Sequence, residues 1–246
     1  MKADPAEQRR LLELAAEDVA LTQLAHRRRT LPEEKAVEAA AEAERSFAVE
    51  VVRAETQVRD LDREQTRLEA DVETVRQRED RDQRLIDSGS VSVKDITGLQ
   101  HELESLKRRQ GDLEDQVLEL MERRETADAT LQAARDGQQQ AAADLERATQ
   151  LRDDALADIA DGTGRHEAAR TALAGQVTAP LLSLYDRVRT QTGTTGAALL
   201  QQRQCQGCRL ELFGKELAAV RAADPAEVVR CENCGRILVR TAESGL

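Results

Sequence analysis

The feature that most constrains the fold of this 246-residue chain is a repeat of apolar residues at alternating spacings of three and four. The first such seam runs from Val37 to Val75, with Glu44 and Gln65 as polar members. This heptad pattern gives a helix one apolar stripe, which is buried when a second helix packs on it. Its apolar members are Val37, Ala40, Phe47, Val51, Ala54, Val58, Leu61, Leu68, Val72 and Val75.

A second seam of the same kind runs from Leu99 to Ile159, after a stretch rich in Gly and Ser between Asp87 and Gly98. Two matching seams joined by a short turn predict an antiparallel helical hairpin, which places Leu68 near Val117. Two capping boxes could begin the second arm, Ser92 to Asp95 and Thr97 to Gln100. The polar members of this seam are Gln110, Arg124, Gln138 and Arg152.

Shorter helices are predicted on either side of the hairpin. Asp4 and Pro5 are a typical helix start, and this helix should continue to about Thr30, before Pro32 interrupts it. A run at 161–164 with two glycines is expected to interrupt the second arm. A further helix from about His166 to Arg189 should then return beside residues 5–30 and form a small bundle.

The composition agrees with a thin helical protein and limits its partners. The chain has two Phe, one Tyr and no Trp, and 34% of its residues are charged, which is typical of long helices rather than a large globular core. The net charge of −11 opposes broad attraction to nucleic acid or acidic membranes. There is no signal-peptide pattern or long apolar run, so a cytoplasmic protein is expected.

Four cysteines at the end of the chain predict a metal site. They form two C-x-x-C pairs, separated by 22 residues, and each pair lets two thiolates from one tight turn approach the same ion. Gly207 and Gly235 permit the φ values and the close backbone approach that such turns need. The predicted ligands of one structural Zn²⁺ are Cys205, Cys208, Cys231 and Cys234.

Two other uses of these cysteines are possible. A redox C-x-x-C would leave the second pair unexplained, and an iron–sulfur cluster would use the same four sulfurs. Paired two-residue spacings around a long insert fit a zinc ribbon better. Within that ribbon Ile237–Val239 is predicted to be a strand, Leu210–Leu212 its counterpart, and Lys215–Ala222 a helix.

The chain resembles a bacterial family of proteins with a C4-type zinc ribbon and an N-terminal coiled-coil hairpin. The resemblance rests on the two cysteine pairs, on Cys234-Gly235-Arg236-Ile237-Leu238, and on Leu99-Gln100-His101-Glu102-Leu103 after the turn. It implies this mainly α fold and a binding role. We predict a coiled-coil hairpin with a base bundle at 1–197 and a C4 zinc ribbon at 198–246. Members of the family are described as nucleic-acid-binding proteins, some linked to an alternative sigma factor, to messenger RNA or to secretion and flagellar components.

A non-enzymatic adaptor or chaperone-like protein that binds another protein is the function we expect. The alternative is non-specific RNA or DNA binding through the ribbon end, where residues 198–242 carry seven basic and five acidic side chains. Neither an enzyme nor a small-molecule substrate is expected, because the three His are isolated and no phosphate-binding loop is present. The candidate phosphate contacts are Arg203, Arg209, Arg236 and Arg240.

Overall fold

The computed structural model describes residues 1–246, and the chain is mainly helical with a small sheet near its C-terminus. It divides into two compact units. One comprises Lys35–Gln150, and the other combines Met1–Glu34 with Leu151–Leu246. No helix contains an apolar stretch of the length and composition that a membrane span requires. The division at residue 197 into hairpin and ribbon stays a prediction about which parts fold independently.

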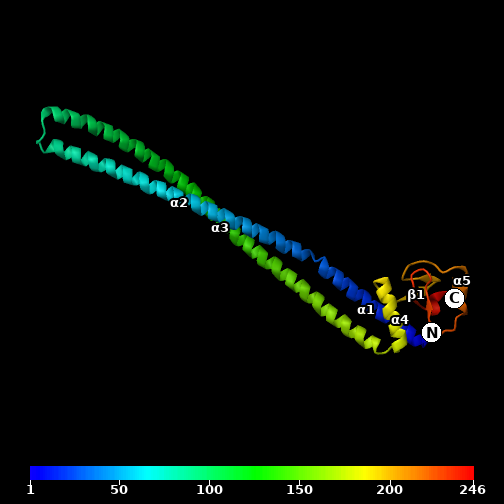
Figure 1. Ribbon diagram of the computed structural model, residues 1–246. Helices are drawn as coiled ribbons and strands as arrows, with labels where there is room; N and C mark the ends of the chain where they lie inside the picture. The colour runs from blue at the N-terminus through cyan, green and yellow to red at the C-terminus, as the bar shows by residue number, and fades with distance from the viewer. The chain divides into compact units, whose positions relative to one another are not determined.

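The unit of residues 35–150 is an antiparallel helical hairpin, as predicted. Helix α2 (Pro32–Asp87) and helix α3 (Val93–Ala174) provide its two arms, which lie side by side in Figure 1. The turn is shorter than expected, because Ser92 accepts a hydrogen bond from the backbone N–H of Asp95 and starts α3 there. The second capping candidate, Thr97, lies within the helix and donates to the carbonyl of Val93.

Pairs of side chains that cross between the arms establish the register. Each pair lies nearly symmetrically about the turn, so the arms are antiparallel. Leu68 packs on a cluster that includes Leu120, within one helical turn of its predicted neighbour Val117. The crossing pairs are Arg76 with Glu114, Arg78 with Glu102, Asp62 with Arg124, Glu55 with Arg135, and Glu44 with Gln138.

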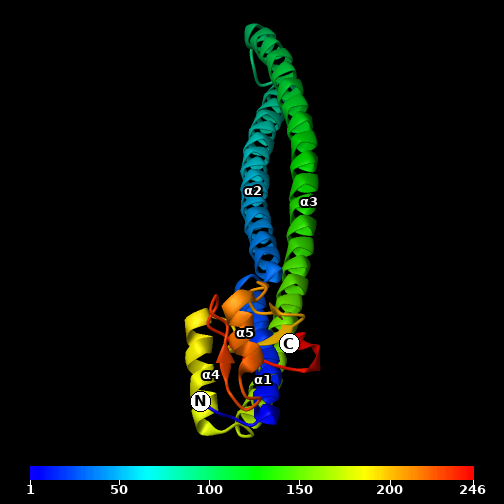
Figure 2. The same ribbon diagram turned by 90° about the vertical axis from the view of Figure 1, so that its right-hand side faces the viewer.

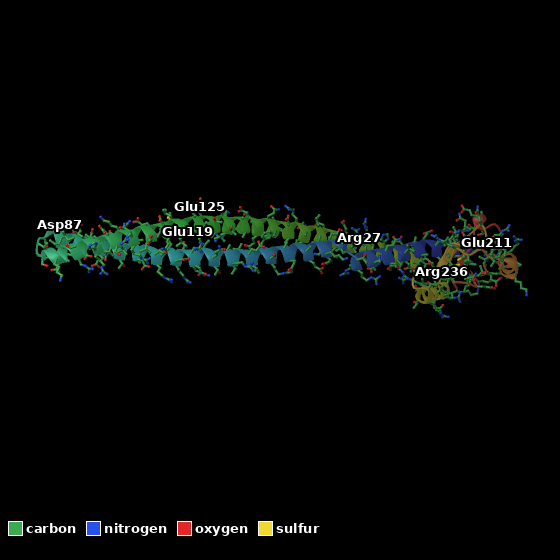
Figure 3. The ribbon with its side chains drawn as sticks, turned by 90° about the horizontal axis from the view of Figure 1, so that it is seen from above. Arg27, Asp87, Glu119, Glu125, Glu211 and Arg236 are labelled. Carbon is green, nitrogen blue, oxygen red and sulfur yellow. The ribbon has the colours of Figure 1, made fainter.

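The polar members of the second seam recur every fourteen residues, and two of them, Arg124 and Gln138, bind partners on the opposite arm. Arg124 donates to Asp62 over 2.5 Å, and the amide of Gln138 donates to Glu44 over 3.4 Å. A shift of one arm past the other would leave these partly buried groups without partners, so the polar layers oppose slipped registers. Charged residues such as Glu125 instead project from the outside of the arms (Figure 3).

Near the turn, the first seam continues through a buried carboxylate. Asp82 follows Val75 at heptad spacing and is only 5% exposed, and its Oδ2 atom has no hydrogen-bond partner. Its other oxygen lies 3.9 Å from Arg81, too far for a hydrogen bond. A buried acceptor without a donor loses its hydration and gains little in return. The buried carboxylate therefore lowers the stability of the hairpin near the turn, compared with an apolar residue at the same position of the seam.

We expect the substitution Asp82→Leu to stabilise the hairpin by about 1 to 3 kcal/mol, because it replaces an unsatisfied buried acceptor with an apolar group. Urea unfolding followed by circular dichroism measures this change. The matched control is Asp80→Leu, since Asp80 is exposed on the same turn of α2, and its effect should stay within about 0.5 kcal/mol. A destabilised Asp82→Leu variant contradicts the assignment.

In the second unit, helix α1 (Pro5–Arg29) begins and ends where the sequence predicts. The Asp4 carboxylate accepts a hydrogen bond from the N–H of Ala6 over 2.6 Å, and Pro5 occupies the first turn. Thr30 closes α1, and Pro32 becomes the first residue of α2, where its missing N–H has no cost.

The predicted interruption of the second arm at 161–164 is wrong, because α3 continues through both glycines to Ala174. Glycine weakens a helix by about 1 kcal/mol but keeps its N–H, so packing can override it. A Cβ atom at Gly162 would lie 3.3 Å from the Leu24 side chain of α1, which explains a small residue there. The predicted helix at 166–189 is consequently two helices, since α4 (Ala179–Thr192) starts anew with Pro180 in its first turn.

A four-stranded sheet completes this unit in the order β2–β1–β4–β3. Strand β1 (Ala197–Gln201) pairs in parallel with β4 (Ile237–Val239), and β4 pairs antiparallel with β3 (Val229–Arg230). Strand β2 (Gln204–Cys205) pairs with β1, while helix α5 (Gly214–Ala222) and a 3-10 turn (Ala242–Ser244) complete the order.

The sheet confirms β4 and the α5 helix but corrects the partner of β4. Residues 210–212 are not a strand, and only Glu211 bridges Gln204. The sequence reading missed β1, whose apolar residues are buried between two clusters. One cluster contains Leu11, Leu14, Leu181, Tyr185, Ala197, Ile237 and Val239, and the other contains Ala198, Leu200, Leu212, Val220 and Leu238.

Candidate metal centre

The four predicted ligands converge on one point of the ribbon. The sulfurs of Cys205, Cys208, Cys231 and Cys234 all lie within 4.8 Å of one another. The Sγ atoms of Cys205 and Cys234 are 3.8 Å apart, and those of Cys208 and Cys231 are 3.9 Å apart. A disulfide needs about 2.05 Å. Four sulfurs at about 2.3 Å from a tetrahedral Zn²⁺ would be separated by about 3.8 Å, which these distances match.

Two similar turns hold the sulfurs in place. In the first, the N–H of Arg209 donates to the carbonyl of Cys205, and in the second the N–H of Gly235 donates to the carbonyl of Cys231. Both donors have left-handed backbones, with φ of 61° at Arg209 and 72° at Gly235. The left-handed residue after the second cysteine is thus a shared requirement of the two turns, and Arg209 meets it at some cost in strain.

Gly207 meets the predicted need for close approach and not the need for a positive φ, which its backbone does not adopt. A Cβ atom there would approach the side chain of Arg236 to 2.6 Å and that of Ala198 to 3.0 Å. The glycine therefore permits close approach of the first turn to β1 and to the second cysteine pair.

The surroundings of the sulfurs shift their pKa values in opposite directions. Burial raises the pKa of Cys205 to about 12 and also raises that of Cys231. Burial acts in the same sense on Cys234, but hydrogen bonds from the backbone and guanidinium of Arg236 outweigh it and lower the pKa to about 7. A divalent cation among the four sulfurs would offset the cost of burying thiolates.

Helix α5 supports the second turn from outside. The carboxylate of Glu216 accepts a hydrogen bond from the N–H of Glu232 over 3.0 Å. Leu212 and Val220 pack on the same buried cluster as Cys205 and Cys231. The cysteines are therefore positioned by a small core and by side chains far away in sequence, and their donor set and spacing fit Zn²⁺ with no open coordination position.

The four candidate phosphate contacts fall into two kinds. Arg203 and Arg209 are exposed, although Arg203 also donates to the carbonyl of Gly245. Arg236 donates to Thr194 and Thr195, and Arg240 donates to five backbone carbonyls between Val220 and Glu227. Arg236 and Arg240 thus connect parts of the ribbon (Figure 3 labels Arg236), and nucleic-acid contact by any of the four stays a prediction.

Sequence reasoning missed an exposed apolar pair beside the metal centre. Leu210 is 51% exposed and Phe213 is 68% exposed, in the segment between the first cysteine turn and α5. The strand predicted over Leu210–Leu212 would have covered Leu210 with its neighbours in the sheet. The sequence did contain a signal for this exposure, because a Phe lies after the first cysteine turn and immediately before the predicted helix. A short segment at such a place has few residues to pack against.

A buried polar cluster in the same unit was also missed. Asp18 is fully buried and accepts hydrogen bonds from the Tyr185 hydroxyl over 2.6 Å and from Arg170 over 2.8 Å. Arg189 forms a further ion pair with the same carboxylate at 3.1 Å. Burial, together with Asp18, raises the pKa of Tyr185. The cluster joins α1, α3 and α4, which stand beside the sheet in Figure 2.

Comparison with known proteins agrees with this architecture. Residues 14–193 match the family of the CT398-like coiled coil hairpin domain, and residues 204–238 match the C4-type zinc ribbon domain. The uncharacterized protein Rv2229c of Mycobacterium tuberculosis is 43% identical over 241 residues, which cover 98% of both chains.

Two solved structures are similar to the chain. A Mycobacterium smegmatis protein has a TM-score of 0.81 and 36% identity, covering 98% of this chain and all of that one. CT398 from Chlamydia trachomatis has a TM-score of 0.58 and 16% identity, covering 95% of this chain and 97% of its own, and so shows a shared fold.

Proposed function

Because the chain belongs to the CT398-like family of coiled-coil hairpin proteins with a C4-type zinc ribbon, we propose that it is a non-enzymatic adaptor that binds another protein. One Zn²⁺, held by all four cysteine thiolates, would stabilise the ribbon that presents the binding surface. A site closed by four sulfurs has no position for a reacting water, so the ion's role would be structural.

The observation that carries this proposal is the exposed pair Leu210 and Phe213. Exposed large apolar groups cost hydration when they remain uncovered, and aromatic side chains are prominent among the residues that dominate protein interfaces. The chain has only three aromatic residues, and Phe213 is the one with a side chain mainly in solvent. The segment between them is fixed by the cysteine turn on one side and by α5 on the other, which favours a preformed contact.

Affinity capture with the tagged full-length protein tests the proposal. We expect the wild-type chain to retain a protein from a bacterial lysate after nuclease treatment, and Phe213→Ser to lose it by about tenfold or more. Zinc content, measured by elemental analysis, should be the same in both, since Phe213 is 68% exposed and does not belong to the buried cluster around the cysteines. The proposal fails if Phe213→Ser retains every protein that the wild type retains.

A matched control separates this surface from other exposed apolar residues. Val52 is 63% exposed on α2, so Val52→Ser removes similar exposed apolar character elsewhere and should leave capture unchanged. Nuclease treatment distinguishes the alternative function. If capture disappears with nuclease, and Arg203→Ala with Arg209→Ala weakens binding on all sequences alike, the ribbon end binds nucleic acid through its phosphates instead.

A further inference from the structure

The bundle of α1, α3 and α4 loses its third helix part-way along. The last turns of α4 lie level with Asp18 of α1 and Arg170 of α3, because Asp186 and Arg189 form ion pairs with these residues. Helix α4 ends at Thr192. Beyond this level α1 continues to Arg29, and the antiparallel helix α3 is present through the residues that precede Arg170 in sequence. Figure 1 shows α1 continuing past the end of α4.

A groove of about 880 Å³ begins at this point, between α1 and α3. Its lining is mainly apolar, and small residues such as Ala160 and Gly164 alternate with larger ones on the α3 side. Gly164 has open space where a Cβ atom would stand, so nothing in the chain fills that position. The apolar residues of the lining are Leu21, Leu24, Ala25, Leu156, Ala157, Ile159 and Ala160.

Positive charge stands at the end of this groove next to the C-terminus of α1. Arg28 lines that end, whereas Arg189, at the end next to α4, already pairs with the buried carboxylate of Asp18 at 3.1 Å. Arg28 belongs to the run Arg27–Arg29, which is exposed and forms no ion pair. Glu167 is the one acidic residue of the lining. In a chain with a net charge of −11, an apolar groove with unpaired cations at one end is complementary to an apolar ligand that carries acidic groups at that end.

We propose that this groove binds an acidic amphipathic helix of a partner protein, which takes the place that a longer α4 would occupy. The inference rests on the proposed adaptor function and adds a second contact surface to it. An apolar stripe at helical spacing would cover Leu21, Leu24 and Leu156, and flanking carboxylates at one end would reach Arg28. Small residues at 160 and 164 allow a helix to approach closely.

The lining favours a helix over single-stranded nucleic acid. It contains no aromatic side chain on which a base could stack. The floor of the groove is apolar along its length. The phosphates of a nucleic acid would need only exposed arginines and would not require an apolar groove. Arg28 and its neighbours Arg27 and Arg29 also complement the C-terminus of α1, but this role does not account for the uncovered apolar floor.

The test uses the full-length zinc-loaded protein and a fluorescein-labelled, stapled 15-residue peptide with one leucine stripe flanked by Glu. Fluorescence anisotropy should show saturable binding, and a peptide with Lys in place of Glu should bind about tenfold more weakly or worse. Gly164→Glu places bulk and negative charge in the groove and should weaken binding of the acidic peptide by about tenfold.

The chain offers matched controls for both kinds of change. Gly111 lies in the same helix with the same open space, so Gly111→Glu should bind the peptide like the wild type. Arg28→Glu should reverse the preference toward the Lys peptide, while Arg123→Glu, at an exposed position of the hairpin, should not.

Three results overturn the proposal. The first is no binding of the acidic peptide, or equal binding by Gly164→Glu. The second is displacement of the peptide by a 15-nucleotide single-stranded RNA that binds more tightly in an Arg28-dependent manner. The third is a dimer in light scattering that Gly164→Glu dissociates, since a second copy would then occupy the groove. If Phe213-dependent capture persists in these cases, the proposal for the groove is rejected, whereas the proposed adaptor function is retained.

Discussion

The substitution Cys231→Ser should release zinc and unfold the ribbon while the hairpin of residues 35–150 stays helical. Zinc contributes on the order of 10 kcal/mol or more to the folding of small modules of this kind, which is as large as the whole stability of many domains. Cys231 is 2% exposed and belongs to the buried cluster around Leu200 and Leu238, so the loss of the ion also removes the group that organises this core.

Two measurements check this expectation in the full-length protein. Elemental analysis should find one zinc per wild-type chain and a marked loss in the variant. Amide hydrogen exchange should show lost protection in β1 and β4, with protection retained in the arms of the hairpin. Asn233→Ser is the matched control, because Asn233 lies exposed inside the same cysteine turn and leaves all four sulfurs in place. Iron in place of zinc, or normal protection in Cys231→Ser, contradicts the assignment.

The substitution Asp18→Ala should destabilise the unit that contains the ribbon by about 3 kcal/mol or more. It leaves the buried Tyr185 hydroxyl without its acceptor and removes the shared partner of Arg170 and Arg189. Deleting one member of a buried charged network costs more than the network contributes, since the remaining groups stay buried and unpaired.

Tyrosine fluorescence isolates this effect from the hairpin. Tyr185 is the only tyrosine and the chain has no tryptophan, so its emission during urea unfolding reports on this unit alone. Asp186→Ala is the control, because Asp186 also pairs with Arg170 but its side chain is 46% exposed, and its effect should be below about 1 kcal/mol. Equal destabilisation by the two variants is inconsistent with a network centred on Asp18.

The hairpin and the metal centre could be predicted from the sequence because their signals are local or periodic. Heptad spacing defines which face of a helix is buried, whatever lies elsewhere in the chain. Two C-x-x-C pairs likewise bring their sulfurs together through turns of a few residues, and Asp4, Pro5 and Pro32 define helix ends by chemistry at those positions.

Tertiary packing alone decided the rest. Continuity of α3 through Gly162 depends on Leu24 of α1, and the pairing of β1 with β4 depends on a core formed by helices far away in sequence. The roles of Arg236 and Arg240 followed from carbonyl and hydroxyl groups that the fold places around them, not from their charge. In the same way, the sequence around Asp18 does not distinguish it from an exposed helix residue. Its burial and its partners on α3 and α4 are properties of the assembled bundle.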